Sequence, residues 1–336
     1  TALGWATSNG HADAVEVLVE AKADAAPTST MNIAASNGDV DTLQVLLAAK
    51  VQVPAQTEPM QTAPLYSAAS NNHSKAVQLL LAAKADNEGS ANSEGCTPLI
   101  IAADCGFMDT LRVLIAAKSS VDDRSGNGDT PISLAIRNGN IAVLQLLVAS
   151  KADITSDCRG FFGPTTALLC AIAECGASDA VNVLINAKAD IDATAKRDHE
   201  TTPLCLAAKA AKADVVKMLL EAKADIDKQH PVRSAVMPRN KRDHATVLKL
   251  LIIAKAETDK VYERDGTTPA FMAAKARQDD LLKILVAAKA DMNKAAHNGQ
   301  TPASVADEAK AAGQYKKKKS KSQKRVVRRK AEVPWA

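Results

Sequence analysis

Large aromatic side chains are scarce in this sequence, and uninterrupted apolar runs are short. Phe, Trp and Tyr make up 3% of the 336 residues, whereas apolar residues in total reach 46%. This composition suits thin stacks of helices lined by Ala, Leu, Val and Ile, and it argues against a pocket built from large rings. No run of 18 apolar residues occurs, so the sequence predicts no membrane span, and no secretory signal is visible.

Motifs that carry catalysis or bind cofactors are also missing. The sequence contains no phosphate-binding loop, no Gly-x-Gly-x-x-Gly, no His-Glu-x-x-His and no calcium-loop spacing. The cysteines, at positions 96, 105, 158, 170, 175 and 205, show no zinc-type spacing, and we expect small buried residues in a reducing compartment. We expect exposed turn or finger positions for the histidines, which are His11, His73, His199, His230, His244 and His297. The sequence therefore predicts no catalytic site, no metal site and no cofactor.

The most regular feature is the phrase Ala-Lys-Ala-Asp, or a close variant, at the end of an apolar run. Its lysines are separated by 28, 34, 34, 33, 37, 35, 32 and 34 residues. Self-similarity at a fixed period of about 20 to 50 residues is typical of a stacked-repeat protein. The nine lysines are Lys22, Lys50, Lys84, Lys118, Lys151, Lys188, Lys223, Lys255 and Lys289.

A second phrase precedes each of these at a near-constant distance. Its clearest copies begin at Thr97, Thr130 and Thr202 and read Thr-Pro-Leu or Thr-Pro-Ile, followed by a short Ala-rich helix. The pair of phrases resembles the ankyrin repeat, whose signature is Thr-Pro-Leu-His-x-Ala followed by a turn, a second helix and a Gly-Ala-Asp loop. The resemblance covers about residues 1–312 in nine copies.

The resemblance implies an all-α solenoid of helix-turn-helix units with short hairpin fingers, which acts as a non-catalytic scaffold for protein recognition. Two departures from the family pattern stand out. The signature histidine never appears, and its positions hold Tyr66, Ile100, Ser133, Leu169, Cys205, Phe271 and Ser304. Lysine also replaces the first glycine of Gly-Ala-Asp. A lysine in left-handed geometry costs about 1 kcal/mol, and its charge near a helix C-terminus returns about 0.3–1 kcal/mol.

We expect the array to span 1–312, with one degenerate unit and an incomplete start. In the eighth unit, at about 230–258, we expect an irregular inner helix over Ser234–Arg242, because Pro238 and Arg239 fall inside it. The chain begins at Thr1 in the middle of a repeat, so we expect that upstream sequence was removed or is missing. A cleaved targeting segment and a longer array are the two explanations.

Residues 313–336 form a basic C-terminal tail. Between 316 and 330 there are ten Lys or Arg residues and no acid, whereas residues 1–315 carry a net charge of about −5. The tail could serve as a nuclear-import signal, a nucleic-acid arm or a solvated extension. The basic residues are Lys316, Lys317, Lys318, Lys319, Lys321, Lys324, Arg325, Arg328, Arg329 and Lys330.

Binding residues are expected where the fingers differ from one another. The longest finger carries Phe161 and Phe162, which either contact a partner or pack against the next finger. The recurring lysines are either a solvated row or a charged contact edge, and the Asp of each Ala-Asp is expected to accept hydrogen bonds in its loop. The partner-binding candidates are Arg124, Asn127, Arg159, Phe161, Phe162, Arg197, His199, Arg239, Tyr262 and Arg264.

The sequence thus predicts a scaffold that binds a protein partner through its fingers and inner helices. The alternatives are a structural subunit of a ribonucleoprotein or other large assembly, anchored by the tail, and a regulatory array cut from a larger enzyme. The expected location is intracellular and reducing, in the cytoplasm or nucleus, or in an organelle if a targeting segment preceded Thr1. The identity of the partner does not follow from the sequence.

Overall fold

The computed structural model describes most of the chain as paired helices. Residues 1–21, 27–51, 53, 63–87, 95–155, 158–160, 163–175, 178–194, 201–237, 244–308 and 310 are described. They fall into two compact units, the first formed by Thr1–Asp190 with Ala195–Arg197, and the second by Ile191–Thr194 with Asp198–Ala336. Each unit is considered separately below.

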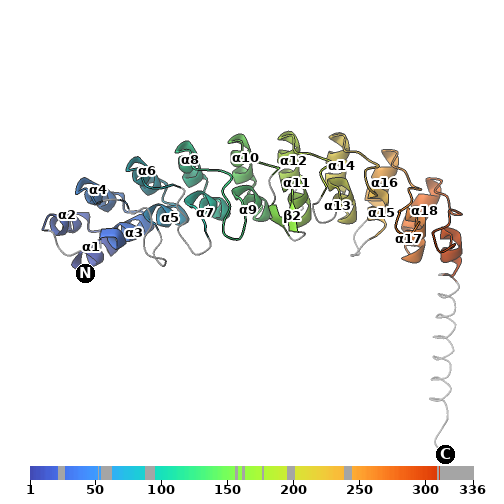
Figure 1. The fold of residues 1–336 in the computed structure, drawn as a ribbon, viewed down its shortest axis with the longest axis horizontal. Coiled ribbons are helices and arrows are strands. Elements are labelled where there is room, and N and C mark those ends of the chain that lie inside the picture. The colour runs from blue at the N-terminus through green and yellow to red at the C-terminus, as the bar shows by residue number, and fades with distance from the viewer. Residues whose placement is uncertain are drawn as a thin grey trace, which may run out of the picture. The chain divides into compact units, whose positions relative to one another are not determined.

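In the first unit, each repeat contributes an inner helix followed by an outer helix, and like helices form two rows (Figure 1). The inner helices are α1 (Ala2–Ser8), α3 (Pro27–Asn37), α5 (Pro64–Ser70), α7 (Pro98–Cys105), α9 (Pro131–Arg137) and α11 (Ala167–Cys170), which continues into a π-helical turn at Ala171–Cys175. The outer helices are α2 (Ala12–Glu20), α4 (Val40–Ala48), α6 (Ser74–Ala82), α8 (Met108–Ala116), α10 (Ile141–Ala149) and α12 (Ser178–Asn186).

The second unit repeats the same plan. Its inner helices are α13 (Pro203–Lys209), α15 (Pro231–Ala235) and α17 (Pro269–Lys275). Its outer helices are α14 (Ala213–Glu221), α16 (His244–Ile253) and α18 (Asp279–Ala287). A further helical segment covers 302–308. The tail from 311 onward lies outside the described residues.

The Thr-Pro phrase starts the inner helices. The hydroxyl oxygen of Thr97 accepts a hydrogen bond from the N–H of Ile100 at 3.3 Å, and Thr202 does the same for Cys205 at 3.2 Å. This satisfies one of the four free N–H groups of the first turn, and the proline that follows has no N–H to satisfy. The small residues after the cap let helices approach closely, and Ala102 and Ala103 have no exposed surface.

The recurring lysines end the outer helices in left-handed geometry. The eight described ones have φ between 60° and 68° and are exposed. Around Lys84, its own N–H donates to the carbonyl of Leu81 and the N–H of Ala85 donates to that of Leu80, both at 3.0 Å. This pair of bonds is the Schellman motif, which satisfies two carbonyls at the end of a helix. The predicted left-handed cap is confirmed, while Lys22 lies outside the described residues.

The longest finger forms a small β-hairpin. Strand β1 (Cys158–Gly160) pairs antiparallel with β2 (Gly163–Thr165), with Cys158 opposite Thr165. Two other fingers turn tightly at Asp265-Gly266 and Asn298-Gly299, with φ of 70° at Gly266 and 79° at Gly299. The hairpin fingers predicted from the resemblance are therefore part of the structure.

The predicted inner helix of the eighth unit was placed too far along the chain. Helix α15 begins at Pro231, so that Pro231 occupies the position of the proline in Thr-Pro-Leu. Ala235 and Val236 then occupy the positions of the Ala-Ala pair, and neither has exposed surface. Arg239 is therefore not part of that pair, and residues 238–243 lie outside the described residues.

Candidate functional site

The inner helices α5, α7 and α9 line a groove in the first unit together with the finger that precedes α9. The finger comprises residues 118–130, and its lining residues include Ser125, Asn127 and Asp129. The groove has an empty volume of about 510 Å³, part of which is open to solvent. Its floor is apolar and consists of buried Tyr66, Ile100 and Leu134 with half-buried Ile101.

An ion pair crosses the groove between the finger and the end of α9. The Arg137 guanidinium donates to both carboxylate oxygens of Asp129, at 3.0 and 3.3 Å. Two parallel bonds of this kind fix the relative position of the planar groups. The Asp129 side chain is 13% exposed and that of Arg137 is 42% exposed, so one edge of the guanidinium faces solvent.

The charges of several carboxylates act on Arg137. Its pKa is raised by the hydrogen bond to Asp129, is lowered in part by burial, and is raised further by the charges of Asp129, Asp104 and Glu174. Of the two aspartates that line the groove, Arg137 pairs with Asp129, while Asp104 has no ion pair within the described residues. The Asp104 carboxylate therefore adds a negative charge to this end of the groove.

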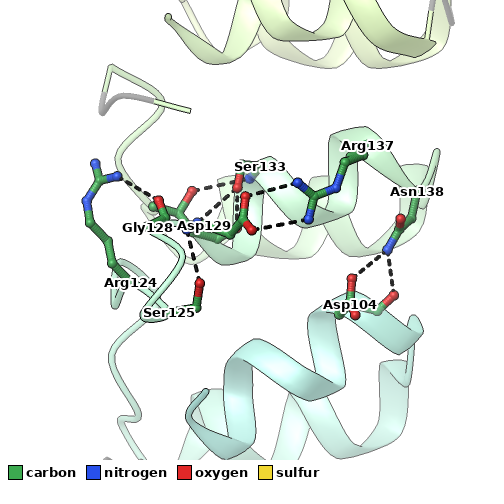
Figure 2. A network of polar contacts seen from close by, with 9 residues as sticks. Asp104, Arg124, Ser125, Gly128, Asp129, Ser133, Arg137 and Asn138 are labelled. Carbon is green, nitrogen blue, oxygen red and sulfur yellow. Dashed lines mark hydrogen bonds and ion pairs between the residues drawn. The ribbon is translucent and has the colours of Figure 1, made fainter. Parts of the chain in front are cut away.

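The finger holds Asp129 in place through a turn of its own (Figure 2). Ser125 donates its N–H to the carbonyl of Asp129 at 2.9 Å, and its hydroxyl oxygen accepts from the N–H of Asp129 at 3.1 Å. Arg124 donates to the carbonyl of Gly128 at 3.1 Å, on the side of the network away from Arg137. Gly128 has a φ of 80°, a left-handed value that glycine adopts without steric strain.

The start of α9 is closed by a reciprocal cap. The hydroxyl of Ser133 accepts from the N–H of Thr130 at 2.9 Å, and that of Thr130 accepts from the N–H of Ser133 at 3.2 Å. Ser133 stands at the position of the signature histidine and stabilises its own helix start instead. Because this cap fixes the first turn of α9, it also fixes Arg137 at the end of the helix.

Asp104 connects α7 to the next repeat. Asn138 donates through Nδ2 to the backbone carbonyl and to Oδ1 of Asp104, each at 2.8 Å (Figure 2). Asp104 is half-buried and lines the groove. Within the described residues, its second carboxylate oxygen has no hydrogen bond. This oxygen is therefore free to accept a hydrogen bond from a bound molecule.

A second set of carboxylates ties consecutive loops together. In the first unit, Asp122 accepts from the N–H of Asp153 at 2.7 Å. In the second unit, Asp227 accepts from the N–H of Glu257 at 2.8 Å, and Asp259 accepts from that of Asp291 at 2.9 Å. These bonds join residues about one repeat apart. The shared sequence signal, which was not among the predictions, is an acid four residues after the repeat lysine, as in the second acid of Ala-Asp-x-Asp at Asp227.

The first acid of that phrase accepts hydrogen bonds inside its own loop, as predicted. Asp153 accepts from the N–H and hydroxyl of Thr155 at 2.8 and 2.6 Å. Asp225 accepts from the N–H groups of Asp227 and Lys228, both at 3.0 Å. These aspartates shape the loops and are already occupied.

Comparison with known protein families agrees with this architecture. A family model described as ankyrin repeats matches residues 3–90, 31–125, 65–158 and 155–230, which together exceed half of the chain. The chain belongs to the ankyrin repeat family. Members of this family are generally protein-interaction modules. Comparison with curated proteins gives no match to this sequence.

Solved ankyrin structures show the same fold. An ankyrin repeat domain from Acinetobacter baumannii AYE is similar with a TM-score of 0.52 and 24% identity, over 58% of this chain and 98% of that one. The human ASB11 ankyrin repeat domain is similar with a TM-score of 0.53 and 19% identity, over 67% of this chain and 99% of that one. At these identities the likeness concerns the fold.

Two of the predicted partner-binding residues lie on the finger beside the groove of this ankyrin array. Asn127 lines it, and Arg124 is exposed on the same finger. Arg159 lies in β1, and nothing is described of its side chain. The charged residues that line the groove were not among the candidates; they are Asp104, Asp129 and Arg137. The remaining candidates outside the described residues are Phe161, Phe162, Arg197, His199, Arg239 and the basic residues of the tail.

The predicted residues Tyr262 and Arg264 lie in the second unit. Tyr262 is half-buried, with the Arg233 guanidinium 3.6 Å from its ring centroid and the His230 ring edge-on at 5.3 Å. Arg264 is exposed, with its guanidinium 5.9 Å from the same ring. A cation held over an aromatic face stabilises the contact between α15 and the next finger. Much of the Tyr262 ring is therefore used within the array.

Asp265 neighbours this cluster and has a lowered pKa. Burial alone would raise the pKa of its carboxyl group. Hydrogen bonds from the hydroxyl and N–H of Thr267, at 2.6 and 3.0 Å, and the positive charges of Arg233 and His297 outweigh that effect. The carboxylate is therefore the stabilised form in the folded array.

Two expectations about histidine and cysteine were wrong in part. His244 begins α16 and is 3% exposed. Its Nε2 lies 3.3 Å from the carbonyl oxygen of Lys209, within hydrogen-bonding distance. It fills the inner turn of its repeat, so it is not an exposed turn histidine. Cys105 is exposed, whereas Cys158, Cys170 and Cys205 are buried as expected. Partial burial of the Cys105 thiol and the negative charge of Asp104 both raise the pKa of this thiol, which disfavours its reactive thiolate.

The described residues contain no group of three or more His, Cys, Asp or Glu side chains arranged to hold a metal ion. In the same part of the chain, no helix has the length and apolar character needed to cross a bilayer.

Proposed function

We propose that this chain is a non-catalytic scaffold that holds a protein partner in the groove of the first unit. The observation that carries the proposal is the arrangement of that groove, with an apolar floor beside charged groups that are fixed in advance. Ile101 and Tyr66 offer apolar surface, while the Asp129–Arg137 pair is held by the finger and by the cap of α9. Binding to prearranged groups loses little conformational entropy.

The shape of the groove favours a protein segment over an enclosed small molecule. The groove is partly open to solvent and lies across three consecutive inner helices. An extended chain or a helix from a partner could contact all three helices, as generally expected of a family of protein-interaction modules. The polar groups at the groove, Asp104 among them, would select the partner by charge.

The test is affinity purification of the partner with the full chain, followed by titration of the purified partner against two variants. Ile101→Glu places a charge on the groove floor and should weaken binding by at least about tenfold, because a buried charge without a partner is costly. Ile115→Glu is the matched control, since Ile115 is also half-buried but lies on outer helix α8 of the same repeat.

Melting curves of both variants show whether the fold is retained. Equal affinities of the wild-type chain and a folded Ile101→Glu variant for the partner would place the binding site elsewhere. The tail would then be the next region to test, because its binding to a nucleic acid or an import receptor stays a prediction. The role of a ribonucleoprotein subunit rests on that tail alone.

A further inference from the structure

Resting on the proposed function, we infer that the partner segment in this groove is cationic. It presents a lysine or arginine side chain to Asp104 and an apolar side chain to the floor beside Ile101. The inference goes beyond the family's general role in protein interaction because it depends on side chains particular to this chain.

The first argument is the charge balance at the groove. Of the two aspartates that line the groove, Arg137 pairs with Asp129, while Asp104 has no ion pair within the described residues. A cation that enters this end of the groove is therefore attracted by the Asp104 carboxylate, and an anion is repelled by it. Arg124 on the same finger donates to the carbonyl of Gly128 and lies at the opposite side of the network (Figure 2).

The second argument is which groups are already occupied. Both carboxylate oxygens of Asp129 accept bonds from Arg137, so this pair is closed. One carboxylate oxygen of Asp104 accepts a hydrogen bond from Nδ2 of Asn138, and the other oxygen has no hydrogen bond within the described residues. The vacant position at the groove is thus an acceptor with negative charge, which an ammonium or guanidinium group fits.

The third argument concerns the alternative of an acidic partner anchored by Arg137. Such a partner would have to compete with Asp129, which is only 13% exposed and holds the guanidinium with two bonds. It would also bring a further negative charge close to Asp104 and Glu174. Both effects oppose binding of an acidic group, so Arg137 is better explained as a residue that positions the finger.

Apolar contact supplies the rest of the expected recognition. Ile101 is half-buried, and it lies on the same inner helix as Asp104, three residues before it. Residues three apart on a helix face the same side, so one ligand can reach both. The expected ligand therefore carries an aliphatic or aromatic residue close to its lysine or arginine.

The experiment is a selection from a phage library of random dodecapeptides against the biotinylated full-length chain. Phages that also bind the Ile101→Glu chain are discarded, which removes peptides or phage coats bound to the basic tail. The retained sequences should be enriched in Lys or Arg next to an apolar residue. The strongest peptide is then synthesised and titrated against purified variants by fluorescence anisotropy.

Asp104→Asn should weaken this peptide about tenfold, since it removes a charged acceptor but leaves an amide that can still accept from Asn138. Asp109→Asn is the matched control, because Asp109 lies exposed on outer helix α8 of the same repeat, and it should leave the affinity within about twofold. Affinity for the wild-type chain should fall as salt rises from about 0.05 to 0.5 M, a measurement that needs no variant.

Three outcomes would overturn the inference. Retained peptides rich in Asp or Glu would show that the groove takes an acidic segment, and the proposed function would stand. Affinity insensitive to salt and to Asp104→Asn would show that charge does not select the ligand, again with the proposed function intact. If the Ile101→Glu counter-selection removed every peptide, both the inference and the groove as binding site would fail.

Discussion

Replacing the left-handed lysines by glycine tests how the outer helices end. Lys84, Lys151 and Lys223 have φ of 61°, 64° and 66° and are exposed. A Cβ atom in this geometry costs about 1 kcal/mol, which glycine avoids. The lysine charge near the helix C-terminus returns about 0.3–1 kcal/mol at low salt. At low ionic strength the two effects nearly cancel, so each Lys→Gly variant should have almost the stability of the wild-type chain.

At about 0.5 M salt the Debye length falls to about 4 Å and the charge effect weakens. Each glycine variant should then be more stable than the wild type by about 0.5 kcal/mol. The three sites lie in separate repeats, so their effects should add to about 1.5 kcal/mol in the triple variant. The assay is urea unfolding followed by circular dichroism at both salt concentrations, with the transition midpoint as the readout.

Lysine-to-alanine changes at the same sites are the matched control. Alanine keeps the Cβ atom and loses the charge, so it should be the least stable of the three residues at low salt. A loss of more than about 1 kcal/mol in Lys84→Gly at both salt concentrations would refute the reasoning. It would mean that these lysines stabilise the array through specific bonds and not through their charge.

Three further predictions concern other parts of the chain. Replacing Phe161 and Phe162 together by Ala should weaken partner binding by about 2 kcal/mol or more with little change in melting temperature, and a lowered melting temperature with unchanged binding would instead place both rings in finger packing. A chain ending at Ala312 should keep its protein partner and lose any nucleic-acid binding. In the full chain, the affinity for nucleic acid should fall with salt at a log–log slope of about −0.7 to −0.9 per phosphate contacted. If the full chain shows no salt-dependent binding to RNA or DNA, the tail is not a nucleic-acid arm. Because the pKa of Asp265 is lowered on folding, its carboxylate should stabilise the array above the unfolded pKa of about 3.9, and this contribution should be lost as pH falls through the lower folded value. The difference in stability between the wild type and Asp265→Asn should therefore shrink below about pH 4, and a difference that grows there would contradict the assignment.

Features set by neighbouring residues could be predicted from the sequence. The capping role of Thr97 and the left-handed turn at Lys84 each depend on bonds that span five residues or fewer. Local propensity alone is enough to indicate such features. The number of repeats and the two rows of helices follow from the regular spacing of the repeat lysines.

Features that depend on contacts between repeats were harder to predict. The bond from Glu257 to Asp227 joins residues 30 positions apart, and the Asn138–Asp104 bond joins residues 34 apart. The sequence pattern does not show which carboxylate accepts such a bond and which one stays open. In the eighth repeat, His-Pro-Val replaces Thr-Pro-Leu, and without the threonine the helix start at Pro231 was overlooked.

The groove itself could be predicted only as a region. The expectation that fingers and inner helices bind the partner included Arg124 and Asn127, which lie on the finger beside the groove. The ion pair of Asp129 and Arg137 was missed because it connects a finger to the far end of the following helix, eight residues later. Its sequence signal is an acid just before Thr-Pro and a base at the last position of the same inner helix.

The measurement that tests the central claim most directly is hydrogen–deuterium exchange of the full chain with and without its purified partner. The account predicts slower exchange on binding in α5, in α7 and across 125–137, where the backbone surrounds the groove. Outer helix α8 of the same repeat should be unchanged, because the groove is formed by inner helices and a finger. Protection confined to the second unit or to the tail, with α7 and α9 exchanging as in the free chain, would contradict the claim that this groove holds the partner.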